Sequence, residues 1–79
     1  MNGRITDHSF AITGMHCSAC AMAIDMELEE LPGVVEARSS FARATVTVTY
    51  DATRVDMTTI ITTLGRAGYV ARPIPRGDG

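Results

Sequence analysis

Cys17 and Cys20 are the only cysteines of the chain, and two residues separate them. The pattern of elements described below places Cys17 in a loop and Cys20 in the first turn of a helix. The unpaired N–H groups and the dipole at a helix N-terminus favour thiolate over thiol. Two neighbouring thiolates form a soft site, which suits a d¹⁰ cation such as Cu(I) better than Mg²⁺, Ca²⁺ or Mn²⁺.

His16 is the imidazole beside this pair and a candidate third ligand. A structural zinc site needs a closed shell of four ligands, which two thiols and one imidazole do not supply. An incomplete shell at the surface suits delivery of a metal, because an incoming thiolate can join before the first two leave. We expect His16 to be an exposed bystander, since adjacent side chains in a loop need not converge, but a ligand or proton-donor role stays open.

Redox chemistry is the main alternative for the Cys17/Cys20 pair. A thiol–disulfide oxidoreductase of the thioredoxin kind also places two cysteines at a helix N-terminus. Such proteins are longer and usually carry tryptophan beside the motif, whereas this chain has 79 residues and no tryptophan. A secreted disulfide scaffold would carry more cysteines. Residues 1–8 lack the pattern of a secretory signal, so we expect a reducing, cytoplasmic location.

Composition excludes several other classes of protein. The length predicts one domain at 1–74, followed by a disordered tail or linker at 75–79. No apolar run approaches the roughly 20 residues that span a bilayer. The net charge of −2 argues against binding to nucleic acid. No catalytic triad, paired-carboxylate cleft or glycine-rich phosphate loop is visible, so the chain is interpreted as a binder and carrier rather than an enzyme.

The first half of the chain predicts a strand and a helix that flank the cysteines. Residues 5–13 alternate weakly between apolar and polar and indicate a strand that ends at Gly14. Ser18 is a good N-cap for a helix that runs to about Leu31 and stops at Pro32-Gly33. Met22 and Met26 are one turn apart on this helix, and we expect them to pack rather than to relay a metal.

The second half predicts two strands, a helix and a last strand. Residues 34–41 form a strand, with one face made of Val35, Ala37, Ser39 and Phe41. Residues 44–50 alternate most clearly, with threonines toward water and apolar residues toward a core. Asp56 caps a second helix, which carries Met57, Ile60, Ile61 and Leu64 at helical spacing. Residues 69–74 form the last strand, at a sheet edge.

This order of elements is typical of an α+β fold. Strand, helix, strand, strand, helix, strand predicts a ferredoxin-like βαββαβ two-layer sandwich, with an antiparallel four-stranded sheet and both helices on one face. His8 is expected to be a surface residue of the first strand, and the acidic residues of the first helix to form a solvated face. A share of those acidic residues could contact a basic patch on a partner.

The stretch Gly14-Met15-His16-Cys17-Ser18-Ala19-Cys20 resembles the Gly-Met-x-Cys-x-x-Cys signature of the heavy-metal-associated domain family. The resemblance extends from about Ser9 to Ala71 and includes Pro32-Gly33-Val34, Val48-Thr49-Tyr50-Asp51 and Gly68-Tyr69. It implies a βαββαβ fold and a metal site at Cys17 and Cys20. Proteins that look like this include copper chaperones, N-terminal domains of P-type copper-transporting ATPases and mercury-binding proteins.

The resemblance also implies supporting roles for other residues. Met15 matches a methionine that points inward beneath the metal-binding loop, and Tyr69 matches an aromatic residue near that loop; Ser18 supports the loop as the expected N-cap. His16 departs from the threonine frequent in copper members, which leaves Hg(II), Zn(II) and Cd(II) as alternatives to Cu(I).

A chaperone or an ATPase domain implies a partner with a similar pair of cysteines. The metal passes to that partner by thiolate exchange. We expect the apo chain to be a monomer, and two copies could share an ion through their exposed sulfurs. Binding to nucleic acid and direct membrane insertion are not expected.

Overall fold

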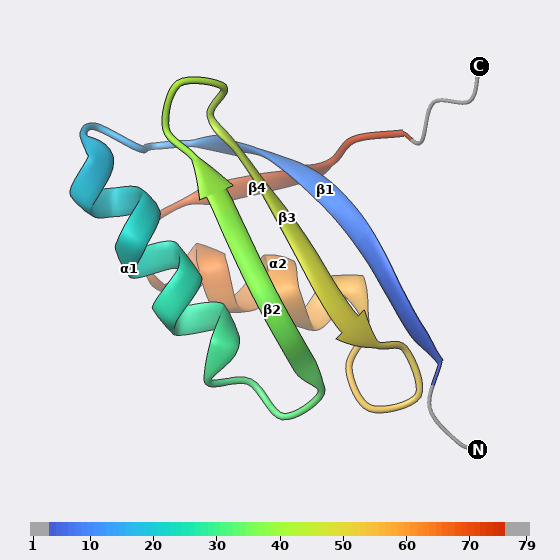
Figure 1. Ribbon diagram of the computed structural model, residues 1–79. Coiled ribbons are helices and arrows are strands. Elements are labelled where there is room, and N and C mark those ends of the chain that lie inside the picture. The colour runs from blue at the N-terminus through green and yellow to red at the C-terminus, as the bar shows by residue number, and fades with distance from the viewer. Residues whose placement is uncertain (1–3, 76–79) are drawn as a thin grey trace.

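The computed structural model describes residues 4–75, and its order of elements is the predicted one (Figure 1). The elements are β1 (Ile5–Thr13), α1 (Ser18–Glu29), β2 (Val34–Ser40), β3 (Thr45–Asp51), α2 (Met57–Arg66) and β4 (Val70–Pro73). The predicted tail at 75–79 lies outside the described residues, apart from Pro75. Among the described residues, no helix is both long and apolar enough to cross a bilayer.

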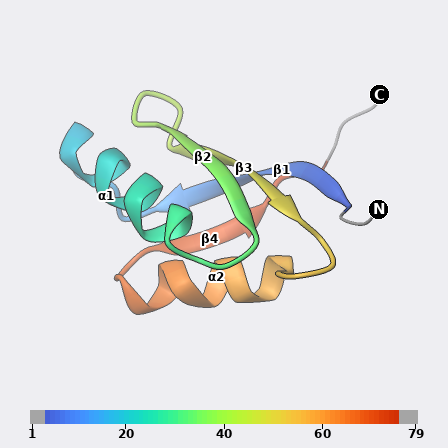
Figure 2. The ribbon, with the colours of Figure 1, turned by 60° about the horizontal axis from the view of Figure 1, so that its bottom comes forward.

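The four strands form one antiparallel sheet in the order β2-β3-β1-β4. α1 packs mainly over β2 and α2 over β4, and the two helices also touch each other. Figure 2 shows α2 below the sheet and α1 to the left. The ferredoxin-like prediction is therefore confirmed, and the two cysteines lie where the turn after β1 enters the first turn of α1.

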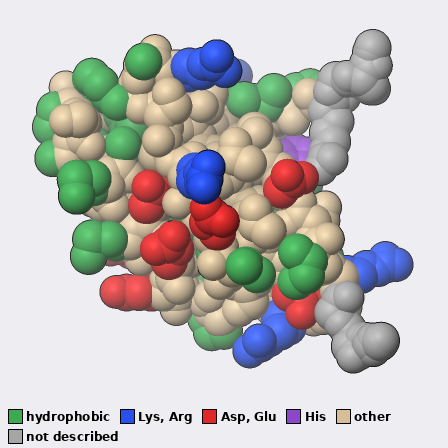
Figure 3. Space-filling view, viewed as in Figure 1, with side chains coloured by type: hydrophobic (Ala, Val, Ile, Leu, Met, Phe, Trp, Pro, Cys, Tyr) green, Lys and Arg blue, Asp and Glu red, His purple; other side chains and the backbone are tan. Residues whose placement is uncertain are grey.

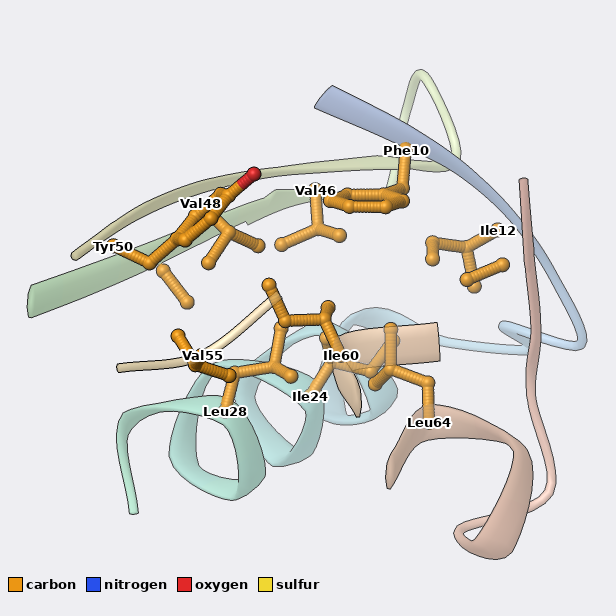
Figure 4. Close-up of a cluster of buried hydrophobic side chains, with 12 residues drawn as sticks. Phe10, Ile12, Ile24, Leu28, Val46, Val48, Tyr50, Val55, Ile60 and Leu64 are labelled. Carbon is orange, nitrogen blue, oxygen red and sulfur yellow. The ribbon is translucent and has the colours of Figure 1, made fainter. Parts of the chain in front are cut away.

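The core lies between the sheet and the helices. Alternate residues of β1 and β3 point toward it, as their apolar pattern predicted. Figure 4 shows the labelled members of this cluster: Phe10, Ile12, Ile24, Leu28, Val46, Val48, Tyr50, Val55, Ile60 and Leu64. Seven side chains of the core are essentially inaccessible to water, which fixes both helices against the sheet.

The prediction that Val35 and Phe41 share one face of β2 with Ala37 and Ser39 is wrong for both of these end residues. Val34 pairs with Tyr50 and Glu36 with Thr49, so Val35 is an extra residue in a β-bulge. The bulge breaks the alternation and leaves Val35 60% exposed. At the other end Phe41 lies beyond the strand, in the turn to β3, and is also exposed.

The helix starts differ in how they are capped. Asp56 caps α2 as predicted, since its carboxylate accepts a hydrogen bond from the Thr59 N–H at 2.9 Å. For α1 the prediction of Ser18 is wrong: the N-cap is Cys17, and Ser18 is the first helical residue. The extended backbone of Cys17, with φ −161°, explains the shift, and its thiol makes no capping hydrogen bond.

His8, which we expected to be a surface residue of the first strand, is only partly exposed. The imidazole is half-buried, and its ring centroid lies 5.5 Å from that of Phe10. Both side chains point to the same face of β1, because they are two residues apart. The Nε2 atom is shielded from water and has no hydrogen-bond partner among the described residues.

Candidate metal centre

The loop that carries the cysteines, residues 14–20 (the metal loop), begins with a conformation that favours glycine. Gly14 has φ +110°, in the region that side-chain-bearing residues rarely adopt. A Cβ atom there would lie 3.3 Å from the Gly68 carbonyl oxygen and 3.4 Å from Cδ1 of Tyr69. The metal loop therefore lies directly against the turn between α2 and β4.

Cys17 is the exposed member of the pair. It is the N-cap residue of α1, and its carbonyl oxygen accepts the Cys20 N–H at 3.0 Å. Because the thiol makes no capping hydrogen bond, its sulfur remains available at the surface. Cys20 lies in the first turn of α1 and is half-buried, and no disulfide joins the two residues.

Several hydrogen-bond donors converge on the Cys20 sulfur. The backbone N–H of His16 contributes most, followed by the Tyr69 hydroxyl, the backbone N–H of Cys17 and the Cys17 thiol. Together they lower the pKa of Cys20 from 9.0 to about 7, against the opposing effect of burial. Cys20 is therefore about half ionised at neutral pH.

Tyr69 lies at the edge of both the core and the metal loop. Its half-buried ring packs against the hydrophobic core. Its hydrogen bond to Cys20 raises the pKa of the phenol, and burial and the negative charge of the thiolates add to this effect. The hydroxyl therefore stays protonated and serves as a donor to the sulfur.

Met15 and His16 lie on opposite sides of the metal loop. Met15 is partly buried and packs against the core, so it anchors the metal loop to the core. His16 is exposed. Within residues 4–75, no group of three or more histidine, cysteine, aspartate or glutamate side chains is placed to hold a metal ion. The structure thus does not gather His16 and the two cysteines into a three-ligand group.

The unpaired N–H groups and the dipole of the helix start were the causes expected to favour a thiolate. The N–H groups that act on Cys20 are those of His16 and Cys17, just before the helix, and the Tyr69 hydroxyl is a further donor that sequence reasoning did not assign to Cys20. The signal available in the sequence was glycine: Gly14 and Gly68 both adopt positive φ, and both lie where the two loops meet.

Comparison with known families gives a match over most of the chain. The model of the heavy-metal-associated domain matches residues 9–70. A solved structure, the N-terminal domain of a potential copper-translocating P-type ATPase from Bacillus subtilis in the Cu(I)-loaded state, superposes with a TM-score of 0.87. It is 30% identical, and the match covers 96% of this chain and 95% of that one.

Two relatives of known name are much longer proteins. A zinc-transporting ATPase from Synechocystis sp. is 40% identical over 58 residues, which are 73% of this chain and 8% of the relative. A mercuric reductase from Acidithiobacillus ferrooxidans is 41% identical over 69 residues, which are 87% of this chain and 12% of the relative. The chain thus spans about a tenth of the length of these relatives, whose names refer to two different metals.

Proposed function

The chain belongs to the heavy-metal-associated domain family, and from this premise we propose that it binds one Cu(I) ion through Cys17 and Cys20 and passes it on by thiolate exchange. The observation that carries the proposal is the state of the pair: an exposed Cys17 beside a Cys20 whose pKa is about 7. A metal ligand must be deprotonated, and here deprotonation costs little at neutral pH.

Transfer follows from the openness of the site. Cys17 faces solvent, so a thiolate of a partner can reach a bound ion from that side. The ion then has three sulfur neighbours. One thiolate of this chain leaves, the second thiolate of the partner takes its place, and departure of the last thiolate of this chain leaves the ion on the partner's pair. Throughout this exchange, the Tyr69 hydroxyl and the N–H of His16 donate hydrogen bonds to the Cys20 thiolate. They stabilise the free thiolate and so lower the free-energy cost of releasing the metal.

Cu(I) is the cargo that this donor set suits best. A two-sulfur site satisfies Cu(I), whereas Zn(II) prefers four ligands, and no third candidate ligand is placed beside the pair among residues 4–75. The Cu(I)-loaded state named for the superposed ATPase domain supports the same choice. The zinc and mercury in the names of the other relatives make Zn(II), Cd(II) and Hg(II) the alternatives to test.

In the cell we propose a cytoplasmic metal-binding module, either a domain of a copper-transporting P-type ATPase or a free copper chaperone. Its role is to bind and deliver metal, not to hydrolyse ATP. Its partner would carry a second thiol pair. The described domain would be a monomer without metal, and a shared ion could join two copies.

A competition titration tests the proposal. The reduced protein is titrated with Cu(I) in the presence of a chromogenic chelator, and we expect tight binding of one ion per chain. The double variant Cys17→Ser/Cys20→Ser should lose it, while Ser18→Ala, a neighbour that contributes no sulfur, should not. Tight binding that survives loss of both thiols would contradict the proposal. Competition with Zn(II), Cd(II) and Hg(II) on the same protein then ranks the metals.

The thiol–disulfide oxidoreductase remains the second candidate, because a cysteine with a pKa of about 7 in this spacing is also a competent nucleophile. It predicts catalytic turnover of a disulfide substrate without Cu(I) affinity. The titration above, run beside a disulfide-reduction assay, separates the two functions.

A further inference from the structure

Two methionines of α1 face solvent, and the prediction that they pack is wrong. Met22 is 67% exposed and Met26 is 61% exposed. The other two methionines among the described residues, Met15 and Met57, are partly buried and pack against the core. Figure 3 shows hydrophobic side chains along the left edge of the molecule, over the metal loop and α1. Core packing therefore explains two of these four thioethers and leaves those of Met22 and Met26 without a structural role.

The spacing of Met22 and Met26 brings their sulfur atoms within reach of one ion. Side chains four residues apart lie on the same side of a helix, with their Cβ atoms about 5–6 Å from each other. Methionine is unbranched and has three rotatable bonds, so two thioethers at this spacing can turn toward a common ion without a change in the backbone. Both residues lie inside α1, which runs unbroken from Ser18 to Glu29. The helix therefore holds the two sulfurs at a fixed separation along its axis.

The chemistry of the thioether determines which ion it would bind. Thioether sulfur is a soft donor of the kind that selects Cu(I), whereas Mg²⁺ and Ca²⁺ take oxygen ligands and a structural Zn²⁺ site needs four ligands. Unlike a cysteine, a methionine loses no proton when it binds a metal. It also brings no negative charge to the cation, so a pair of thioethers binds more weakly than a pair of thiolates.

The charge of α1 favours a cation at this position. Asp25 and Glu29 lie beside the two methionines, and both accept hydrogen bonds from β2 through their carboxylates. Glu30 follows Met26 by four residues, is exposed, and forms no ion pair with another described residue. α1 itself carries no basic residue. This concentration of negative charge raises the local concentration of a cation around the helix.

We propose that Met22 and Met26 form a second, weaker Cu(I) site, which holds an additional ion per chain through two thioether sulfurs. Both side chains are exposed, on the side of α1 away from its buried residues. Met22 lies five residues beyond Cys17, which is about 8 Å along the helix axis, so the two sites share no ligand. The second site does not depend on the proposed function, because it can be measured in a chain without thiols.

Nuclear magnetic resonance of isotope-labelled methionine methyl groups tests the second site. Each methyl carbon is bonded to the sulfur in question, and Cu(I) is diamagnetic, so binding shifts the signal without broadening it. The variant Cys17→Ser/Cys20→Ser removes the thiol pair; serine is a good N-cap, so α1 should be kept, which circular dichroism checks. Cu(I) added under a reductant should shift the signals of Met22 and Met26 and leave those of the two packed methionines in place.

Single substitutions distinguish one shared ion from two separate contacts. Met22→Leu and Met26→Leu keep an apolar side chain with a similar helix propensity. If both sulfurs hold the same ion, either substitution should weaken binding at the remaining methionine by at least about tenfold, because a tethered second ligand is lost. Met57→Leu is the matched control and should leave the titration unchanged. Binding at the remaining methionine that is as strong as before would overturn the shared site.

The unmodified, reduced chain gives a second readout. The first equivalent of Cu(I) should fill the thiol pair, and only further Cu(I) should shift the signals of Met22 and Met26. That second step should be the same at about pH 6 and about pH 8, because a thioether carries no proton to displace. Zn(II) should shift neither signal.

The two proposals fail in different ways. Signals of Met22 and Met26 that stay in place in excess Cu(I), in both the thiol-free and the unmodified protein, would overturn the second site and leave the thiol pair untouched. Thiols that bind no Cu(I), while the two methionine signals still shift, would overturn the proposed function and support the second site.

Discussion

The Tyr69 hydroxyl donates a hydrogen bond to the sulfur of Cys20, and this contact joins the turn before β4 to the metal loop. The two residues are far apart in sequence and meet because Gly14 allows the loops to touch. The pKa of the thiol falls and that of the phenol rises, as expected when a neutral donor serves a thiolate.

Tyr69→Phe removes this donor and keeps the ring. We expect the pKa of Cys20 to rise from about 7 toward 9.0, but not to reach it, because the larger contribution of the His16 N–H remains. An ultraviolet titration of thiolate absorbance measures the change. A pKa that does not move would show that the hydroxyl has no electrostatic role at the site.

Cu(I) affinity should depend on pH with a midpoint set by Cys20. Above about pH 7 the thiolate is already formed; below it a proton must be displaced, so affinity falls by about tenfold per pH unit for each proton released. Chelator competition across this range checks the slope. In Tyr69→Phe the midpoint should move upward, and an affinity that is independent of pH around neutrality would contradict the assignment of Cys20 as a ligand.

The apo protein should also lose some stability as the pH falls. The folded-state pKa of Cys20 is below its ordinary value of 9.0, so its contribution to the free energy of unfolding is full above pH 9. It diminishes between pH 9 and about 7 and is absent at lower pH. Urea unfolding of the reduced protein measures the curve, and Cys20→Ser should flatten it over this window. A Cys20→Ser curve that runs parallel to the original would contradict this prediction.

Gly14→Ala should destabilise the fold by about 1–3 kcal/mol, the usual cost of forcing a side-chain-bearing residue into an unfavourable backbone region. The new Cβ would also press on the Gly68 carbonyl oxygen. Gly65→Ala is the matched control, because nothing lies within 4 Å of its Cβ and it sits inside α2. The control should gain up to about 1 kcal/mol from helix propensity. The urea concentrations at the unfolding midpoints of the two variants compare their stabilities. Equal changes in stability would contradict the close approach of the two loops at Gly14.

The sequence predicted the topology well because local signals agreed with one another. Alternation in β3, the N-cap at Asp56 and the break at Gly14 each marked an element that the structure contains. Errors arose where a tertiary feature overrides the local pattern. The bulge at Val35 shifts one residue out of register and leaves no local sequence signal. The position of His8 could have been predicted, because it is two residues from Phe10 and shares its face of β1.

The place of the candidate site in the fold could be predicted from the sequence, but the full set of donors to the Cys20 sulfur could not. The spacing of Cys17 and Cys20 located the pair at the start of a helix, but the exact N-cap depended on a backbone angle that no pattern reveals. The hydrogen bonds that ionise Cys20 come from the fold of the loop and from a residue after α2. The exposure of Met22 and Met26 likewise depends on which side of α1 faces the sheet.

X-ray absorption on the Cu(I)-loaded protein tests the central claim most directly, because it reports the number and type of atoms around the metal. The proposal predicts two sulfur neighbours and no imidazole, with a spectrum that His16→Asn leaves unchanged. A nitrogen neighbour that disappears in His16→Asn, or a copper shell without two sulfurs, would contradict a site made by Cys17 and Cys20 alone.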